Sequence, residues 1–183
     1  KSDETLESIT DYFKVDLQKC ALANSLRPES ELSEGQVIFV PNAELDWVTR
    51  QEINGDLFVR PLKRFYLSSP YGWRPSPFTG IRSFHNGIDM AISEGTPVRP
   101  ALIGVVSSTG FNSVYGNFVI LSHHSGYKTL YAHLSAITCS KGQSVGLNTM
   151  IGRVGSTGQS TGPHLHFTVY KNGKTVSPFS LMK

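Results

Sequence analysis

The sequence predicts a mainly β protein, in which an antiparallel β-sheet domain follows a small α+β domain. Three observations lead to this fold class. Apolar residues with helical spacing are confined to residues 1–43, many short segments rich in β-branched and aromatic residues follow from residue 57 onward, and Gly-rich turns separate those segments. We therefore expect three parts: a small domain over residues 1–43, a linker over residues 44–56 and a β domain over residues 57–183.

Composition narrows the class of protein. The chain has 183 residues, 39% hydrophobic and 17% charged, as is typical of a folded globular protein. No apolar run is long enough for a transmembrane helix, and the net charge of +3 includes no Lys/Arg block, so we expect neither a membrane span nor a nucleic-acid partner. The first residues, Lys1–Glu4, are polar and do not have the pattern of an export signal, so they do not indicate the compartment. The sequence does not predict the oligomeric state.

The first part has the order helix, helix, strand. The first helix is indicated by four apolar residues on one face, Leu6, Ile9, Tyr12 and Phe13. Thr5 or Asp3 is its expected N-cap. Apolar residues between positions 17 and 26 suggest a second short helix, and residues 36–40 suggest a strand that ends at Pro41.

Two features concern the connection between the parts. Residues 44–56 include the turn-forming sequence Asn54-Gly55-Asp56 and are expected to be a connector. Cys20 and Cys139 lie far apart and lack CxxC spacing, so we expect buried free thiols, with a single bridge between the two halves as the alternative.

The β domain is indicated by four clear strand segments and one turn. The segments are residues 102–107, 118–122, 127–131 and 164–170. Lys171-Asn172-Gly173-Lys174 predicts a tight hairpin, because Asn-Gly readily adopts the positive φ angles that such a turn requires. Short strands joined by Gly-rich turns favour an antiparallel sheet.

Two histidines lie at the start of the last predicted strand. His164 and His166 are two residues apart, so their side chains project from the same face of the strand. Leu165 and Phe167 then point to the opposite, apolar face. An HxH pair by itself is most simply a surface pair, and its meaning depends on its neighbours in the fold.

A second pattern, His85-Asn86-Gly87-Ile88-Asp89, offers two further metal ligands. Imidazole nitrogen and carboxylate oxygen both suit zinc, and Gly87 is expected to let the chain bend so that both reach one ion. The HxH pair supplies a third ligand and leaves a fourth position open, as in catalytic zinc sites. His133, at the end of a predicted strand, is either a core histidine or a part of this site. Spacing does not decide which of the last three histidines binds metal and which is a base.

The β domain contains an ordered series of motifs: Ser69-Pro70-Tyr71-Gly72-Trp73-Arg74, His85-Asn86-Gly87-Ile88-Asp89-Met90-Ala91, Gly95-Thr96-Pro97-Val98, Tyr115-Gly116-Asn117, Tyr131-Ala132-His133-Leu134, Gly155-Ser156-Thr157-Gly158 and Ser160-Thr161-Gly162-Pro163-His164-Leu165-His166-Phe167. In these motifs the domain resembles the lysostaphin/LytM-type zinc metallopeptidases, which cut peptide bonds in peptidoglycan. The resemblance implies an antiparallel β metallopeptidase domain. It also implies that His85, Asp89 and His166 bind Zn2+ and that His133 and His164 are catalytic.

Between the two catalytic histidines we favour His133 as the general base, with the other hydrogen-bonded to the developing oxyanion. The chain has no HExxH motif. Asn117 is either a substrate or metal contact or a turn residue. Tyr131 and Arg74 either line the groove or pack in the core. We expect His123 and His124 to be solvent-exposed and without a role.

Residues 1–43 resemble a LysM module, a small glycan-binding domain. The resemblance rests on Glu4-Thr5-Leu6-Glu7-Ser8-Ile9, on Asn24 and on Gly35-Gln36-Val37-Ile38-Phe39-Val40-Pro41. Asp3-Glu4 stands where the family has Gly-Asp, and the first strand is almost absent, so the module is either degenerate or truncated at its N-terminus. The alternative is a packing or linker domain that binds nothing.

These resemblances imply a zinc-dependent endopeptidase that acts on cross-links or stem peptides of peptidoglycan during cell-wall remodelling. Its location would be the periplasm, the cell envelope or outside the cell. The competing hypotheses are a silent relative that activates other wall hydrolases, an enzyme autoinhibited by residues 1–64, and a pure glycan-binding module. Silent relatives usually lack metal ligands, whereas this chain keeps all five site residues. The sequence does not predict which bond is cut.

Overall fold

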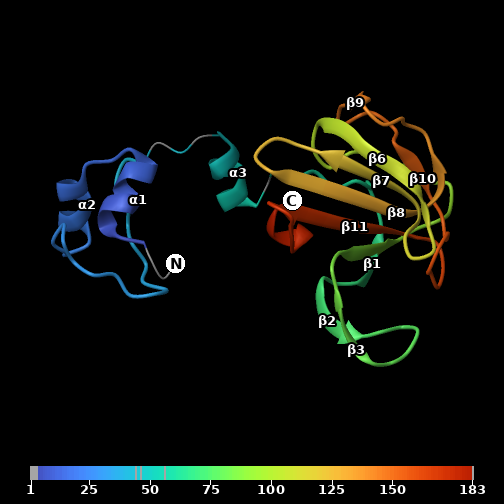
Figure 1. The fold of residues 1–183 in the computed structure, drawn as a ribbon, viewed down its shortest axis with the longest axis horizontal. Coiled ribbons are helices and arrows are strands. Elements are labelled where there is room, and N and C mark those ends of the chain that lie inside the picture. The colour runs from blue at the N-terminus through green and yellow to red at the C-terminus, as the bar shows by residue number, and fades with distance from the viewer. Residues whose placement is uncertain (1–3, 44, 46, 56, 183) are drawn as a thin grey trace. The chain divides into compact units, whose positions relative to one another are not determined.

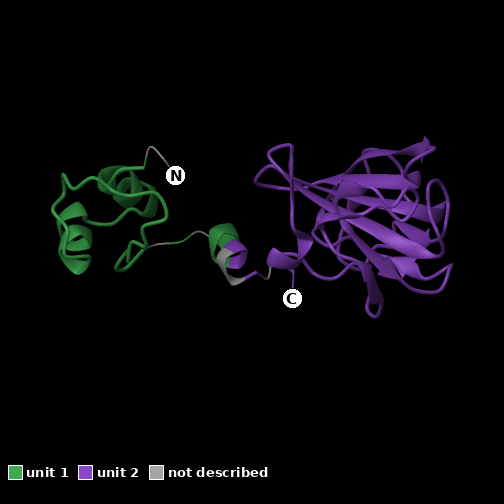
Figure 2. Cartoon of the chain, turned by 90° about the horizontal axis from the view of Figure 1, so that it is seen from below, with its two compact units in different colours: residues 1–50 green, residues 51–183 purple. Residues whose placement is uncertain are grey.

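The structure is a computed structural model of the chain and describes residues 4–43, 45, 47–55 and 57–182 (Figure 1). It divides into two compact units, residues 1–50 and 51–183 (Figure 2). Helix α3 (Trp47–Asn54) crosses this boundary, so the segment expected to be a connector is largely helical. Asp3 and Asp56, to which two of our predictions refer, lie outside the described residues. No described helix has the length and apolar character needed to cross a membrane.

The first unit contains the two predicted helices, α1 (Leu6–Phe13) and α2 (Leu17–Ala23). Thr5 is the N-cap of α1: its hydroxyl accepts a hydrogen bond from the Ser8 N–H at 3.1 Å, and Ser8 Oγ accepts one from the Thr5 N–H at 3.0 Å. Leu6, Cys20 and Ala21 form the buried core between the helices. Both predicted helices are confirmed.

The predicted strand over residues 36–40 does not form. A strand needs a neighbour for its backbone groups, and among the described residues of this unit no second strand pairs with it. At Phe39 the side chain of Asn24 bonds the backbone groups that a neighbouring strand would bond. Its oxygen accepts from the Phe39 N–H at 2.7 Å, and its amide donates to the Phe39 carbonyl at 2.6 Å. Val37 and Phe39 remain 91% and 64% exposed.

The second unit is built on a ten-stranded sheet whose main path runs β1-β4-β11-β8-β7-β6-β9, with antiparallel pairing between neighbours. Two more strands form a separate hairpin, β2–β3, which projects from the main sheet beside β1 (Figure 1). The strands are β1 (Tyr66–Ser69), β2 (Gly72–Pro75), β3 (Arg82–His85), β4 (Ile88–Ala91), β5 (Pro97–Val98), β6 (Gly104–Asn112), β7 (Gly116–Ser122), β8 (Tyr127–Ile137), β9 (Ser144–Val145), β10 (Gly152–Val154), β11 (His164–Lys171) and β12 (Lys174–Val176). A 3₁₀ turn, η1 (Pro178–Ser180), follows.

All four predicted strand segments are confirmed, and two of them, β8 and β11, start at the predicted residue. The segment expected at residues 102–107 is instead β6, which starts at Gly104 and continues to Asn112 because it pairs with β7 along that length. The hairpin turn is also confirmed: β11 pairs with β12 across Asn172 and Gly173, whose φ angles are 49° and 81°. The predicted mainly β fold class is therefore correct.

The core of the second unit lies on the face of β11 opposite the histidine pair. Leu165, Phe167 and Val169 are fully buried, and the Phe167 ring packs at 5.3 Å from that of Tyr131 on β8. Cys139 is a buried free thiol in this unit, as Cys20 is in the first. The central position of β11, between β4 and β8, brings residues from three strands to one point of the sheet.

Candidate metal centre

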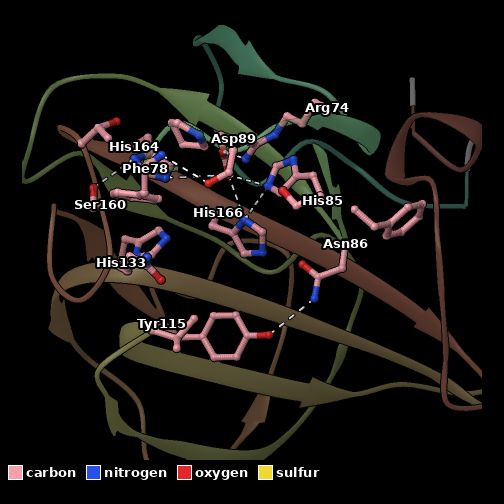
Figure 3. Close-up of a pocket in the computed structure, with 17 residues that line it drawn as sticks. Arg74, Phe78, His85, Asn86, Asp89, Tyr115, His133, Ser160, His164 and His166 are labelled. Atoms are coloured by element: carbon pink, nitrogen blue, oxygen red, sulfur yellow. Dashed lines mark hydrogen bonds and ion pairs between the residues drawn. The ribbon is translucent and has the colours of Figure 1, made fainter. Parts of the chain in front are cut away.

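Three predicted ligands converge on one point (Figure 3). His85 ends β3, Asp89 lies in β4 and His166 lies in β11, directly paired with Asp89 in the sheet register. Asp89 Oδ1 lies 2.8 Å from His166 Nδ1 and 3.2 Å from His85 Nε2, and the two nitrogens are 3.2 Å apart. The structure thus brings together the three residues that the resemblance implied as ligands.

These separations fit a tetrahedral zinc ion. Ligand atoms bound at about 2.0–2.1 Å in tetrahedral geometry lie roughly 3.3 Å from one another. The observed triangle of two nitrogens and one oxygen is close to that size, and its donor set of two imidazoles and one carboxylate is one that zinc prefers. A fourth position on the cleft side would remain open, as a catalytic ion requires.

Each ligand histidine is oriented through its second ring nitrogen. His85 Nδ1 lies 2.8 Å from the Pro70 carbonyl, which only accepts, so Nδ1 carries the hydrogen and Nε2 presents a lone pair. His166 Nε2 lies 3.0 Å from the Thr168 hydroxyl, which leaves Nδ1 for the metal. Such outer partners fix the tautomer and the ring plane of a metal-binding histidine.

The protonation states also suit a cation. Burial by itself raises the pKa of the Asp89 carboxyl, but hydrogen bonds and electrostatic interactions with His166 and His85 outweigh burial, so this pKa falls well below its usual range. Burial lowers the pKa of His166, against the opposing effect of Asp89. At neutral pH the carboxylate is therefore ionised and His166 is neutral, and these are the forms that bind metal.

The other two predicted histidines lie beside the triad. The rings of His133 and His164 are 4.7 Å apart, and the His133 ring is 5.8 Å from that of His166. Nδ1 of His133 lies 2.8 Å from the Thr157 carbonyl, and Nδ1 of His164 lies 2.8 Å from the Gly162 carbonyl. Because both carbonyls accept, each ring carries a hydrogen on Nδ1, and its Nε2 is the nitrogen left to exchange a proton in the cleft.

His133 has an unusual backbone that sequence analysis did not anticipate. Its φ angle of 62° is left-handed, which is rare for a residue within a strand. The pairing of β7 with β8 is irregular between Asn117 and Val119, opposite this residue, and the His133 N–H instead donates to the Tyr115 carbonyl at 2.8 Å. This bulge turns the imidazole toward the cleft. Burial lowers the pKa of His133 to about 4, although its bond to the Thr157 carbonyl opposes the shift.

Gly87 is required for a different reason than the one we predicted. Its φ angle is not in the left-handed region. An added Cβ would instead lie 2.5 Å from the Phe167 carbonyl, 2.7 Å from Thr168 Oγ1 and 2.9 Å from His166 Cε1. The absence of a side chain thus lets the loop between β3 and β4 pack against the strand that carries His166.

The triad and the histidine pair line an open cleft of about 310 Å³. Arg74 lines this cleft, as one of our two interpretations proposed. Tyr131 does not: it is fully buried, and its hydroxyl accepts from the Ala101 N–H at 2.8 Å. The cleft also contains Tyr115 and Phe78, to which the sequence analysis gave no role (Figure 3). Tyr115 belongs to the motif Tyr115-Gly116-Asn117, and its place in that motif is the sequence feature that could have predicted its position in the cleft.

Two further predictions are settled by hydrogen bonds outside the cleft. The Asn117 side chain donates to the Leu134 carbonyl at 3.0 Å and joins β7 to β8, so its role is structural. His123 is not solvent-exposed as expected: its ring nitrogens lie 2.8 Å from the Ile103 carbonyl and 2.7 Å from Thr129 Oγ1, because the side chain folds back onto the sheet. His124 is exposed, as predicted.

Comparison with known proteins agrees with this geometry. Residues 83–178 match the family model of Peptidase family M23. The DD-carboxypeptidase/endopeptidase Mpg of Neisseria meningitidis serogroup B is 45% identical over 127 residues, which are 69% of this chain and 29% of that protein. The peptidoglycan DD-endopeptidase ShyA of Vibrio cholerae is 35% identical over 181 residues, which cover 91% of this chain and 41% of that protein. The chain therefore spans less than half the length of either relative.

Among solved structures, the catalytic domain of the antimicrobial peptidase lysostaphin from Staphylococcus simulans is similar, with a TM-score of 0.57 and 32% sequence identity. The likeness covers 62% of this chain and 89% of the lysostaphin domain. The matched family region begins within β3 and ends just after β12, so it includes all five predicted site residues.

Proposed function

The chain belongs to peptidase family M23, and on this premise we propose that it is a zinc-dependent endopeptidase that hydrolyses peptide bonds of peptidoglycan. One observation carries the proposal: the triad of His85, Asp89 and His166 lies in an open cleft beside two histidines that each bind a backbone carbonyl through Nδ1 and leave Nε2 for proton exchange. Metal ligands and proton acceptors in one cleft are what metal-assisted hydrolysis requires.

The residues divide the work according to their geometry. His85 Nε2, Asp89 Oδ1 and His166 Nδ1 would hold the zinc ion. When bound, zinc supplies Lewis acidity at the cleft. We assign the role of general base to His133: its lowered pKa keeps Nε2 unprotonated at neutral pH, so it can accept a proton from the attacking water. The protonated Nε2 then donates to the leaving amine, and His164, when it carries a proton on Nε2, would donate to the developing oxyanion from the neighbouring position.

The substrate proposal follows from the named relatives. Mpg and ShyA are DD-peptidases, so we propose that this chain cuts a bond between D-residues in a cross-link or stem peptide. Because that polymer lies outside the cytoplasmic membrane, we propose that the protein acts in the periplasm, in the cell envelope or outside the cell. The silent-activator alternative is not favoured, because all five site residues are present and arranged as a site. Autoinhibition by residues 1–64 is a separate proposal, which truncation of that segment would test.

Release of soluble peptides from purified peptidoglycan tests the proposed function. The assay compares the protein as purified, after chelation, after return of zinc, and as the His133→Ala variant, with fragment masses identifying the bond. His124→Ala is the matched control, because His124 is exposed and outside the cleft. We expect activity that zinc restores, that His133→Ala abolishes and that His124→Ala retains. One zinc ion bound per chain with no cleavage of any wall type would refute the proposal.

For the first unit we propose that residues 1–43 are a LysM-like module that holds the enzyme near wall glycan. The helix pair and the Asn24 contact with Phe39 support a compact module, and tethering would raise the local substrate concentration. The test is sedimentation of the His166→Ala full chain with insoluble peptidoglycan, with and without chitin oligosaccharide as competitor. Binding that the oligosaccharide does not reduce would contradict glycan recognition.

A further inference from the structure

Arg74 is the one cationic side chain among the described residues that line the cleft. It lies in β2, opposite Ser83 of β3 in the separate hairpin, and its side chain is 22% exposed. The guanidinium faces the triad: Nη2 lies 3.7 Å from Asp89 Oδ2, the oxygen on the far side of the carboxylate from the two histidine nitrogens (Figure 3). The hairpin therefore delivers a fixed positive charge to the edge of the metal centre.

The protein leaves most of this guanidinium's hydrogen-bonding capacity unused. Nη1 donates to the Pro75 carbonyl at 3.3 Å, which is a long bond, and the distance to Asp89 exceeds that of a hydrogen bond. Nε is buried and has no hydrogen-bond partner in the described structure. A guanidinium carries five N–H donors, and buried donors normally find partners. Arg74 is thus incompletely satisfied at the edge of a substrate cleft.

The charge of the cleft indicates which chemical group on a substrate would bind the unused donors of Arg74. With zinc bound, Asp89 ionised and neutral histidines, the metal centre has a net charge of +1, and Arg74 brings the cleft to +2. Such a cleft attracts anions. Among anionic groups, a carboxylate matches the planar guanidinium fork, because two parallel N–H donors bind its two oxygens.

The position of Arg74 limits where that carboxylate lies on the substrate. Asp89 is shared: Oδ1 belongs to the triad, and Oδ2 faces the guanidinium. The guanidinium lies beyond this carboxylate, with Nη2 3.7 Å from Oδ2. An extended peptide advances roughly 3.3–3.6 Å per residue, which is close to this distance, so an anion on the guanidinium would belong to a residue adjacent to the reacting centre.

We propose that Arg74 is a specificity-determining residue that binds a substrate carboxylate on the residue next to the cleaved bond. This inference rests on the proposed peptidase function. Two sources offer the same chemistry: the free C-terminal α-carboxylate of a stem peptide, and a side-chain carboxylate of a diamino acid in the cross-link. Arg74 selects substrates by charge and leaves the proton transfers to the histidines.

The test uses matched synthetic peptides with the zinc-loaded full chain. Pairs of peptides differ only in whether the C-terminal carboxylate, or the side-chain carboxylate next to the scissile bond, is free or amidated. We expect the wild type to prefer one free-acid peptide by about 10- to 100-fold in kcat/KM, the range for a charged hydrogen-bonded pair. Arg74→Gln should lose this preference mainly through KM, so that its kcat/KM values for the free-acid and the amidated peptide converge. Arg74→Lys should restore part of it.

The control variant is Arg82→Gln. Arg82 lies on the same hairpin but stacks over the Trp73 ring at 5.3 Å and does not line the cleft, so its removal tests for a general effect of charge. We expect the preference to persist. Zinc content is measured for each variant. An equal loss on all peptides accompanied by loss of zinc would overturn the proposal and make Arg74 a positioning residue for Asp89.

A binding measurement separates this inference from the proposed function. If the wild type cleaves neither peptides nor peptidoglycan, the proposed function fails. Calorimetric titration of the same peptides into zinc-loaded His133→Ala and His133→Ala/Arg74→Gln proteins still decides the role of Arg74. Tighter binding of a free-acid peptide that depends on Arg74 supports the inference, and equal affinity for acid and amide overturns it.

Discussion

The cleft contains two groups of histidines that the fold treats differently. In the triad, His85 and His166 direct a ring nitrogen at Asp89, within 3.2 Å. In the other group, the rings of His133 and His164 lie against each other, and His164 Nε2 is 3.7 Å from Asp89 Oδ1. In the roles proposed above, the same side chain would be a metal ligand or a proton carrier according to its distance from one carboxylate.

The partners of the second ring nitrogen differ between the rings. Thr168, on the same strand as His166, holds that ring from within the sheet, whereas the Pro70 carbonyl, between β1 and β2, holds His85. Thr157 and Gly162, in the segment between β10 and β11, hold His133 and His164 through backbone carbonyls. The triad is thus positioned by the register of β4 with β11 and by one loop, whereas both rings of the pair depend on the segment before β11. Substitutions in the two groups should consequently have separable effects on zinc binding and on turnover.

The largest effect is expected from removal of a triad member. His166→Ala should abolish zinc binding and lower kcat/KM by at least about 10³-fold, because several kcal/mol of Lewis-acid stabilisation are lost at about 1.4 kcal/mol per tenfold. Zinc stoichiometry by atomic emission and peptide release measured together test this. If the variant kept one zinc ion per chain, His166 would not be a ligand, and the distinction between the triad and the histidine pair would be wrong.

The next effect concerns His133. His133→Ala should lower kcat by about 10²- to 10⁴-fold, the range for a lost general base, while zinc stoichiometry stays at the wild-type value. His133→Asn is the conservative variant, because Asn tolerates the left-handed backbone at φ 62°. It should fold as well as the wild type and be equally inactive. A variant that loses zinc would place His133 with the ligands.

A smaller effect on zinc binding is expected from substitution of Thr168, which contacts the second ring nitrogen of His166. Thr168→Val keeps the shape of the side chain but removes the hydroxyl that lies 3.0 Å from His166 Nε2. Zinc affinity should fall by about 10- to 100-fold, with activity recovered at saturating zinc. Competition with a chelator of known affinity measures the change. Thr175→Val, which alters a hydroxyl near Tyr71 outside the cleft, is the control and should not affect zinc affinity.

The smallest effect concerns His123, which lies outside both groups. Burial lowers the pKa of His123 below its ordinary value of 6.5. As the pH falls, the imidazole is therefore protonated in the unfolded chain before it is protonated in the folded one. The stability that His123 contributes is complete above about pH 6.5 and is lost as the pH falls below that value. The slope is at most about 1.4 kcal/mol per pH unit. His123→Gln should destabilise the protein more at pH 7 than at pH 5 in urea unfolding. A destabilisation independent of pH would contradict this account.

Local patterns predicted much of the fold. The HxH strand was recognisable because polar and apolar residues alternate along it, and β11 indeed buries Leu165 and Phe167 opposite the histidines. Asn172-Gly173 predicted its turn for a similarly local reason. The strand expected at residues 36–40 failed because a strand is stabilised by a partner that its own sequence does not reveal. Helix α3 was missed because turn residues at its end obscured a short helical segment.

The sequence by itself determined which residue types were available for the site and the fold class, and through family resemblance it predicted which residues are the ligands. Only the tertiary structure decided how those residues act. The pairing of His166 with Asp89, the bulge at His133 and the close approach of Gly87 to β11 each arise from contacts between segments distant in the chain. Spacing along the chain specifies side chains and local direction, whereas ligand distances, tautomers and pKa values depend on which strands become neighbours.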